Sequence, residues 1–322
     1  MSGRIQNKKG FGREWESVLY RLRNCLIPDV VLKKIRNSQV KNVLIVPQHI
    51  LHYLPFVSLV VEQDKTNNDP KLMPMPKFVL DESFDVFQVP SLVVWDSLRQ
   101  MENRPLNSFS VLGISTFSQA SSLVGVKKDI DNINNAFGRE RVQTIAENNA
   151  TKDALKTNLA QRGLLLVATH GINNPCDPLR GLLLLRSGKG NDDEITAEEI
   201  FETTVGTDLV ILSACYSGLA EQSPLPGDDL FGIQRALLHG GARAVIAGMW
   251  DVYDSTGPII VGGLLRRLSV GESASAALAG AQRDFMKQQR AEGSTNPWTH
   301  PYFWAVYTLT GDGRVSCVVD KP

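Results

Sequence analysis

Cysteine is scarce in this sequence, and its scarcity excludes several classes of protein. The four cysteines among 322 residues are Cys25, Cys176, Cys215 and Cys317. They lie far apart and form no C-x-x-C pair, which argues against a zinc ribbon and against a dithiol redox site. So few cysteines would make a poor disulfide framework, and free thiols in a reducing compartment fit better. We therefore expect no metal and no cofactor.

Long hydrophobic runs and an excess of charge of one sign are also lacking. The longest apolar stretches, such as 164–168 and 209–212, have the length of a strand and cannot span a bilayer. The basic N-terminus lacks the apolar run of a signal peptide. Lys plus Arg equals Asp plus Glu at 34 each, and no cluster of basic and aromatic residues indicates nucleic acid binding. We expect a soluble, cytoplasmic protein that binds neither nucleic acid nor membrane.

The sequence does contain an alternation of strand-like and helix-like segments. Residues 1–40 are predicted to form an N-terminal helical segment or linker, because Trp15, Leu19 and Leu22 recur at helical spacing. Residues 41–322 are predicted to form one larger domain. Its main strand-like runs are 110–114, 142–145, 164–169, 182–186, 208–214, 244–249 and 305–309. The helix-like segments between them are 127–137, 152–161, 197–201, 230–239, 256–268 and 274–289.

Several of the strand-like runs are apolar on both faces, for example LLLVA, LVIL and AVIA. Such runs are typical of a parallel sheet that helices cover on both sides. The predicted fold class is therefore α/β, a mostly parallel, doubly wound sheet with helices on both faces.

Two of these strands end in residues that can carry chemistry. The run 164–169 leads into His170 and Gly171, and the run 208–214 leads into Cys215. The carboxyl ends of parallel strands meet at one edge of the sheet, so imidazole and thiol meet there if these strands are neighbours. A histidine can take the proton of a thiol and make the sulfur nucleophilic. The backbone N–H groups of Gly171 and Cys215 are candidates for an oxyanion hole.

A structural role for both residues stays open at this point. A cysteine at the end of a buried strand is often an inert part of the core, and a histidine there is often a satisfied structural residue. The combination favours catalysis, because each residue is expected in a glycine-flanked turn after an apolar strand.

Several motifs together resemble those of the CHAT peptidase domain, which is related to caspases and separase. They are LHYLPF at 51–56, ATHG at 168–171, ITAEEI at 195–200, LVILSAC-x-SG at 209–218, GDDLFGIQRALLHGGARAVIAGMWDV at 227–252 and HPYFWAVYTLTGDG at 300–313. These motifs occur in the order that the family has. The resemblance implies a caspase-like peptidase domain over residues 41–322, with His170 as base and Cys215 as nucleophile.

The sequence departs from the family pattern in two ways. Many members have an acidic residue and then Thr after the cysteine, whereas Tyr216 and Ser217 stand here and are expected to alter the rim of the pocket. Tetratricopeptide-repeat arrays often precede this domain, and no repeat period stands out in this sequence. A sensing module of that kind is therefore expected to be a separate subunit or to be absent.

The resemblance also suggests where a substrate side chain would be selected. Metacaspases place an acid two residues before the cysteine, and Ser213 occupies that position here. The segment 250–254 resembles separase-like enzymes, so Asp251 or Asp254 is expected to pair with an Arg or Lys of the substrate. The alternative is that Asp254 simply caps the helix that follows it. Ser213, Asp251 and Asp254 are the candidates for substrate binding.

The predicted function is a cysteine endopeptidase that cleaves a protein substrate after a basic residue. We expect a sensor or a tetratricopeptide-repeat subunit to gate it in bacterial signalling or defence. Two alternatives stay open: a non-catalytic caspase-like interaction module, and a cysteine hydrolase that acts on a small amide. The presence of both His170 and Cys215 favours the peptidase over the interaction module.

Overall fold

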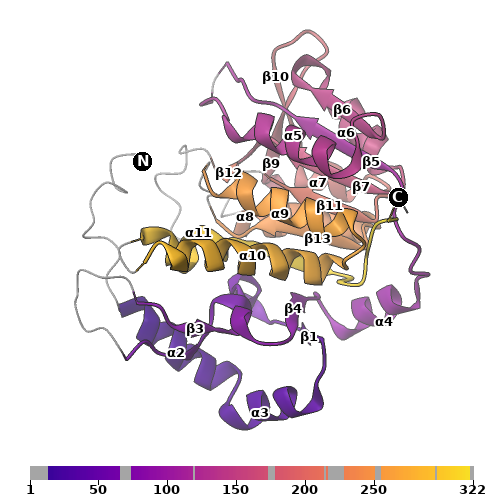
Figure 1. Ribbon diagram of the computed structural model, residues 1–322. Helices are drawn as coiled ribbons and strands as arrows, with labels where there is room; N and C mark the ends of the chain where they lie inside the picture. Colours follow the sequence, from indigo (N-terminus) through magenta and orange to yellow (C-terminus); the bar gives the residue numbers. More distant parts are fainter. Residues whose placement is uncertain are drawn as a thin grey trace.

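The computed structural model describes residues 14–65, 74–118, 120–172, 178–213, 215–216, 228–250, 255–293 and 296–319 (Figure 1). Its strands are β1 (Asn42–Ile45), β2 (Val60–Glu62), β3 (Lys77–Phe78), β4 (Asp85–Gln88), β5 (Phe109–Gly113), β6 (Val142–Ala146), β7 (Leu164–Ala168), β8 (His170–Ile172), β9 (Leu182–Arg186), β10 (Asp192–Thr196), β11 (Leu209–Leu212), β12 (Cys215–Tyr216), β13 (Ala244–Gly248) and β14 (Tyr307–Gly311). Its α-helices are α2 (Glu14–Leu26), α3 (Asp29–Ser38), α4 (Leu92–Gln100), α5 (Gly125–Phe137), α6 (Lys152–Leu159), α7 (Ala197–Phe201), α8 (Asp228–Gly240), α9 (Gly257–Ser269), α10 (Ala274–Ala291) and α11 (Pro301–Trp304). None of the helices in these ranges combines the length and the apolar character needed to cross a bilayer.

An eight-stranded sheet forms the centre of the described part of the chain. Its strand order is β1-β4-β14-β13-β11-β7-β5-β6. Neighbouring strands are parallel except β13 and β14, which are antiparallel. The strands from β6 to β13 therefore point one way, and β14, β4 and β1 point the other way. The predicted fold class, α/β with a mostly parallel sheet, is confirmed.

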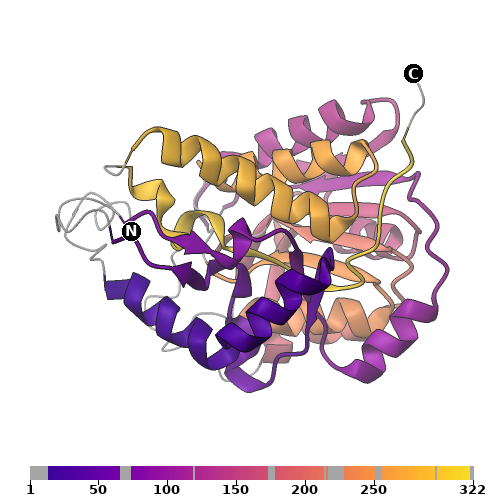
Figure 2. The ribbon, with the colours of Figure 1, turned by 60° about the horizontal axis from the view of Figure 1, so that its bottom comes forward.

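Helices cover both faces of this sheet, as predicted from strands that are apolar on both faces. Alternate residues of β7 point to opposite sides: Leu166 belongs to a core cluster with residues of α5, α9 and α10, whereas Leu165 belongs to a second cluster with residues of α6, α7 and α8. All five residues of β7 are buried. Figure 2 shows α9 and α10 side by side over the first of these faces.

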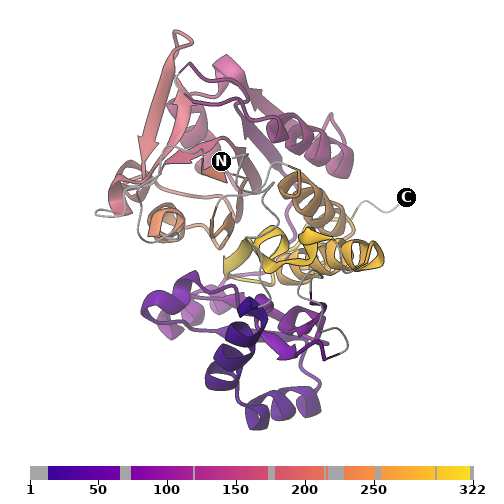
Figure 3. The same cartoon turned by 90° about the vertical axis from the view of Figure 1, so that its left-hand side faces the viewer.

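A smaller, four-stranded sheet with the order β10-β9-β8-β12 stands beside the main one. The run 182–186, predicted as a strand, is β9 of this smaller sheet, where it is antiparallel to both β8 and β10. The hairpin of β9 and β10 stands at one end of the molecule, and the N-terminal elements stand at the other (Figure 3).

The N-terminal helices pack against the strands that follow them. Arg23 of α2 is only 2% exposed and donates hydrogen bonds to the carbonyl oxygens of Val60 and Val61 in β2. Leu32 of α3 lies in a core cluster with Phe56, Leu59, Val79 and Phe84. The predicted helical content of 1–40 is thus correct for the described residues, while the division of the chain at residue 40 stays a prediction.

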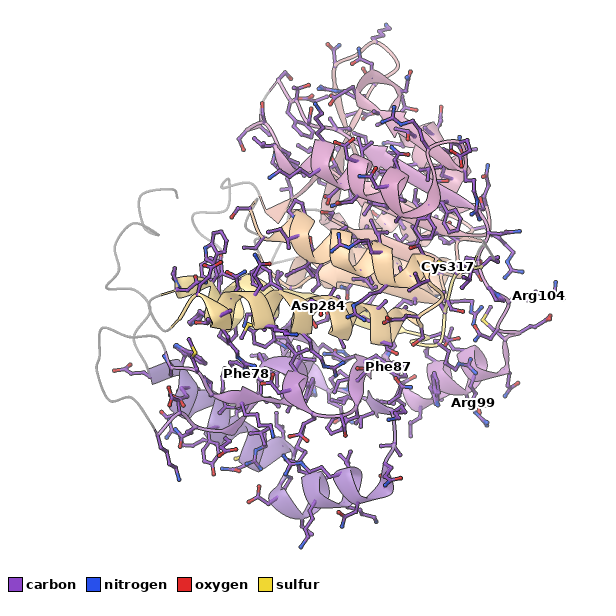
Figure 4. All side chains as sticks on the ribbon, viewed as in Figure 1. Phe78, Phe87, Arg99, Arg104, Asp284 and Cys317 are labelled. Carbon is purple, nitrogen blue, oxygen red and sulfur yellow. The ribbon has the colours of Figure 1, made fainter. Side chains whose placement is uncertain are left out.

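An aromatic cluster joins α2 to the C-terminal helices. The ring of Phe78 lies 6.1 Å from that of Trp15 and 4.9 Å from that of Trp304. The ring of His300 meets Trp15 edge-on at 4.9 Å, and burial lowers the pKa of His300 to about 4. Figure 4 shows Phe78 and Phe87 between α10 and the N-terminal elements.

Buried charged side chains link the elements at the edge of the main sheet where β11 and β13 begin. Arg243, 2% exposed, donates to the fully buried carboxylate of Asp312 at 2.7 Å, and Arg314 donates to the same carboxylate at 2.8 Å. Burial alone would raise the pKa of Asp312, but the hydrogen bonds from Arg314 and Arg243 outweigh it and lower that pKa. Asp208 adds a second buried carboxylate, which accepts hydrogen bonds from Arg162.

We predict that Asp312→Asn lowers the free energy of unfolding by about 3–5 kcal/mol, because it leaves the buried guanidinium group of Arg243 facing a neutral amide in the core. The depressed pKa of Asp312 means that its contribution is present above the unfolded-state pKa, about 3.9, and is lost as the pH falls through its lower folded-state pKa. Urea denaturation at several pH values measures both effects.

The matched control for this prediction is Asp96→Asn. The side chain of Asp96 is 52% exposed and pairs with Arg99 on the surface, so its loss should cost less than about 1 kcal/mol. Equal losses from the two substitutions would contradict a dominant role for the buried cluster.

Candidate active site

Two short strands bring the predicted catalytic pair together. In the main sheet, β7 and β11 are parallel neighbours, and each continues into a strand of the smaller sheet, β8 or β12. There β8 and β12 are also parallel neighbours, with His170 opposite Cys215 and Gly171 opposite Tyr216. Parallel neighbours lie about 4.8 Å apart, so the backbones of His170 and Cys215 are as close as the predicted pairing of imidazole and thiol requires. The side chain of Cys215 lies outside the described residues.

The expectation that His170 precedes a sharp turn is wrong. Gly171 continues β8 and lies opposite Leu183 of β9. Because β9 supplies an antiparallel partner, the chain after His170 stays extended. The oxyanion role of the Gly171 and Cys215 amides stays a prediction.

The ring of His170 is held in one orientation. The side chain is fully buried, and its Nε2 lies 2.6 Å from the carbonyl oxygen of Ser121. A carbonyl oxygen only accepts hydrogen bonds, so Nε2 carries the proton and Nδ1 of the neutral ring is the basic atom. Among the described residues, Nδ1 has no hydrogen-bond partner. The contact with Ser121 thus leaves Nδ1 available as a proton acceptor.

The connection between β5 and α5 supplies that carbonyl and packs against the histidine. The ring of Phe117 lies 4.6 Å from the ring of His170. Glu147, which follows β6, accepts hydrogen bonds from the Ser115 backbone at 3.0 Å and from the Thr116 hydroxyl at 3.1 Å. Burial would raise the pKa of Glu147, but the hydrogen bond from the Ser115 hydroxyl, those from the Ser115 backbone and the Thr116 hydroxyl, and the charge of Arg186 outweigh it and lower the pKa. Glu147 has a φ of 49°, a left-handed conformation that few residues other than glycine adopt.

Arg186 also holds the connection between β5 and α5 in place. It donates to the carbonyl of Thr116, pairs with Asp192, and lies 5.5 Å from the centre of the Phe117 ring. Phe117, Glu147 and Arg186 were not among the residues predicted from the sequence. Only Glu147 had a detectable signal, since it follows a strand at the edge of the sheet where His170 and Cys215 were expected.

Ser213 lies two residues before Cys215 and is 7% exposed. Its hydroxyl donates to the Asp129 carboxylate at 2.6 Å and lies 3.4 Å from the Tyr307 hydroxyl. Asp129 is on α5 and is 2% exposed. The structure therefore places an unpredicted acid beside a predicted substrate-binding residue, whose own role stays a prediction.

The other two predicted selectors, Asp251 and Asp254, lie outside the described residues. Within the described ranges, no group of three or more His, Cys, Asp or Glu side chains is arranged to hold a metal ion.

Comparisons with known proteins agree with this architecture. The chain is 29% identical to mouse tetratricopeptide repeat protein 28 over 136 residues, and 27% identical to the human protein over the same length. The aligned segment is 42% of this chain but only 5% of either relative.

The fold is shared with solved structures at low sequence identity. Separase in the Saccharomyces cerevisiae separase–securin complex superposes with a TM-score of 0.52 at 14% identity, over 84% of this chain and 15% of that one. The Arg-specific cysteine proteinase gingipain R of Porphyromonas gingivalis superposes with a TM-score of 0.50 at 10% identity, over 94% of this chain and 67% of that one.

A family model described as CHAT domain matches residues 16–312, starting ahead of the predicted boundary at residue 40. The match takes in both catalytic candidates and nearly every described helix and strand. The chain belongs to the CHAT domain family.

Proposed function

We propose that this protein is a cysteine endopeptidase in which His170 and Cys215 act as base and nucleophile. The observation that carries the proposal is the pairing of these two residues as register partners on adjacent parallel strands. The hydrogen bond between His170 Nε2 and the Ser121 carbonyl supports it, because it leaves Nδ1 as the atom that accepts a proton.

The reaction follows from these roles. Nδ1 of His170 takes the thiol proton of Cys215, and the thiolate attacks the carbonyl carbon of the scissile peptide bond. The backbone amides of Gly171 and Cys215 donate to the developing oxyanion, each for about 3 kcal/mol of barrier. The protonated imidazole gives its proton to the leaving amine as the C–N bond breaks. Water, deprotonated by His170, then hydrolyses the thioester and restores the free thiol.

The substrate in this proposal is a partner protein, cut after a basic residue, and a sensor or partner gates the activity in bacterial signalling or defence. The matched relatives are named for tetratricopeptide repeats, which supports a tetratricopeptide-repeat subunit as that partner. The name of gingipain R, an Arg-specific proteinase with the same fold, agrees with a basic cleavage site.

We predict that Cys215→Ala lowers the kcat of peptide cleavage by on the order of 10³-fold or more, because it removes the nucleophile. His170→Ala should lower it comparably, and the double variant should be no worse, since the two residues act as one unit. Cleavage of a mixed peptide library, with candidate partner proteins added, measures both effects.

Cys25→Ala is the matched control, since Cys25 is exposed on α2, which lies far from β8 and β12 in the sequence and apart from β12 in Figure 1. Its activity should equal that of the wild type. Full activity in Cys215→Ala would contradict the proposal. No cleavage under any condition, with the Cys215 thiol unreactive to alkylation, would favour the non-catalytic interaction module.

We also predict that Glu147→Ala lowers kcat by roughly 10–100-fold with little change in KM. The substitution releases the backbone and hydroxyl groups of Ser115 and Thr116, and with them the segment that fixes the His170 ring. Steady-state kinetics on the best library peptide gives both constants. The control is Glu140→Ala, an exposed residue just before β6. A rise in KM with unchanged kcat would show that the segment binds substrate and does not orient the base.

A further inference from the structure

We propose that Asp192, on the hairpin of β9 and β10, is a positioning residue for the base His170. The inference rests on the proposed peptidase function and deepens it, because it assigns the orientation of the base to a side chain outside the main sheet. Asp192 acts through the connection between β5 and α5, whose Ser121 carbonyl lies 2.6 Å from Nε2 of His170.

The place of Asp192 in the hairpin is the first argument. Asp192 lies directly opposite Arg186 in the antiparallel pairing of β10 with β9, so the two side chains stand on the same face of the hairpin. They form an ion pair in which the arginine side chain is 7% exposed and the aspartate side chain 15% exposed. Removing one partner of such a pair leaves the other buried without its counter-charge. Asp192 therefore also keeps Arg186 in its place.

Both members of this ion pair bind the connection between β5 and α5. One carboxylate oxygen of Asp192 accepts hydrogen bonds from the backbone N–H of Ser118 at 2.9 Å and from its hydroxyl at 2.5 Å. The guanidinium group of Arg186 donates to the Thr116 carbonyl and lies 5.5 Å from the centre of the Phe117 ring. One ion pair thus holds three consecutive residues of the connection.

The same hairpin holds the backbone on either side of His170. After it, Gly171 lies opposite Leu183 of β9. Before it, the Thr169 hydroxyl donates to the Leu184 carbonyl of β9 at 2.6 Å. The hairpin therefore fixes both the backbone of His170 and the connection against which its ring lies.

The connection in turn orients the His170 ring. Its Ser121 carbonyl accepts the hydrogen bond of Nε2, and the Phe117 ring lies 4.6 Å from the imidazole. A neutral imidazole can carry its proton on either nitrogen, and only the tautomer protonated on Nε2 leaves Nδ1 as the base. Loss of Asp192 would release the connection from the hairpin, and with it the acceptor that selects this tautomer.

The alternative is that Asp192 only stabilises the hairpin. The two roles differ in their effect on the His170 ring, which ¹⁵N NMR of the whole chain with labelled histidine measures directly. The spectra are recorded in the Cys215→Ala background at alkaline pH, where imidazole is neutral, so the result does not depend on activity. His170→Ala in the same background assigns the signals, and thermal unfolding midpoints check that the variants fold.

We expect one tautomer, protonated on Nε2, when Asp192 is present, and a mixture of both in Asp192→Ala. In the chain that keeps Cys215, Asp192→Ala should lower the kcat of peptide cleavage by roughly 10–100-fold with little change in KM, the scale for a misplaced catalytic group. Asp192→Asn should lie between the two in both measurements, because its amide oxygen still accepts a hydrogen bond from Ser118. This isosteric variant decides the question if Asp192→Ala does not fold.

Glu194→Ala is the matched control, since Glu194 lies two residues further along β10, carries the same charge and is exposed. It should keep the wild-type kcat and the single tautomer. Wild-type kcat in Asp192→Ala, or a lower kcat with the tautomer unchanged, would overturn the positioning role while leaving the peptidase intact. If no condition gives cleavage, the peptidase function fails, and the NMR comparison alone supports or overturns the control of the His170 ring by Asp192.

Discussion

The parallel pairing of β7 with β11 is the constraint on which the candidate site depends. Leu164 to Val167 lie opposite Leu209 to Leu212 in unbroken register, and every one of these residues is buried. Each strand has apolar neighbours on both faces. A slip of the register by one residue would move its core side chains to the opposite face of the sheet. The same register is carried forward into β8 and β12, where it sets His170 opposite Cys215. The placement of His170 opposite Cys215 therefore rests on hydrophobic packing several residues earlier in each strand.

Acidic side chains at the two edges of the sheet have different hydrogen-bond donors. Where β11 and β13 begin, the carboxylates of Asp208 and Asp312 are bound by arginine side chains. Where β5, β7 and β11 end, Glu147 and Asp129 accept hydrogen bonds from hydroxyl groups of Ser115, Thr116 and Ser213. At the first edge, arginine side chains offset the charge of the carboxylates. At the second, Glu147 ties the connection between β5 and α5 to the end of β6, and Asp129 ties helix α5 to the segment that carries Cys215.

Much of this architecture could be predicted from the sequence, because strands apolar on both faces have few solutions other than a covered parallel sheet. Asp129 could not, because it stands in the polar stretch KKDIDN and its partner Ser213 is 84 residues away. The hydrogen bond between His170 and the Ser121 carbonyl could not be predicted either, because a backbone carbonyl contributes nothing to the pattern of side chains. Strands of two or three residues, such as β12 and β8, are too short to show any periodicity.

The single antiparallel pair of the main sheet, β13 with β14, has a consequence for how such a chain can diversify. Because β14, β4 and β1 run opposite to the remaining strands, the loops that follow β1 and β4 emerge at the edge away from His170 and Cys215. Insertions after those two strands would therefore emerge on the side of the sheet opposite these two residues. The N-terminal half of the sheet can present surfaces that are separate from that edge.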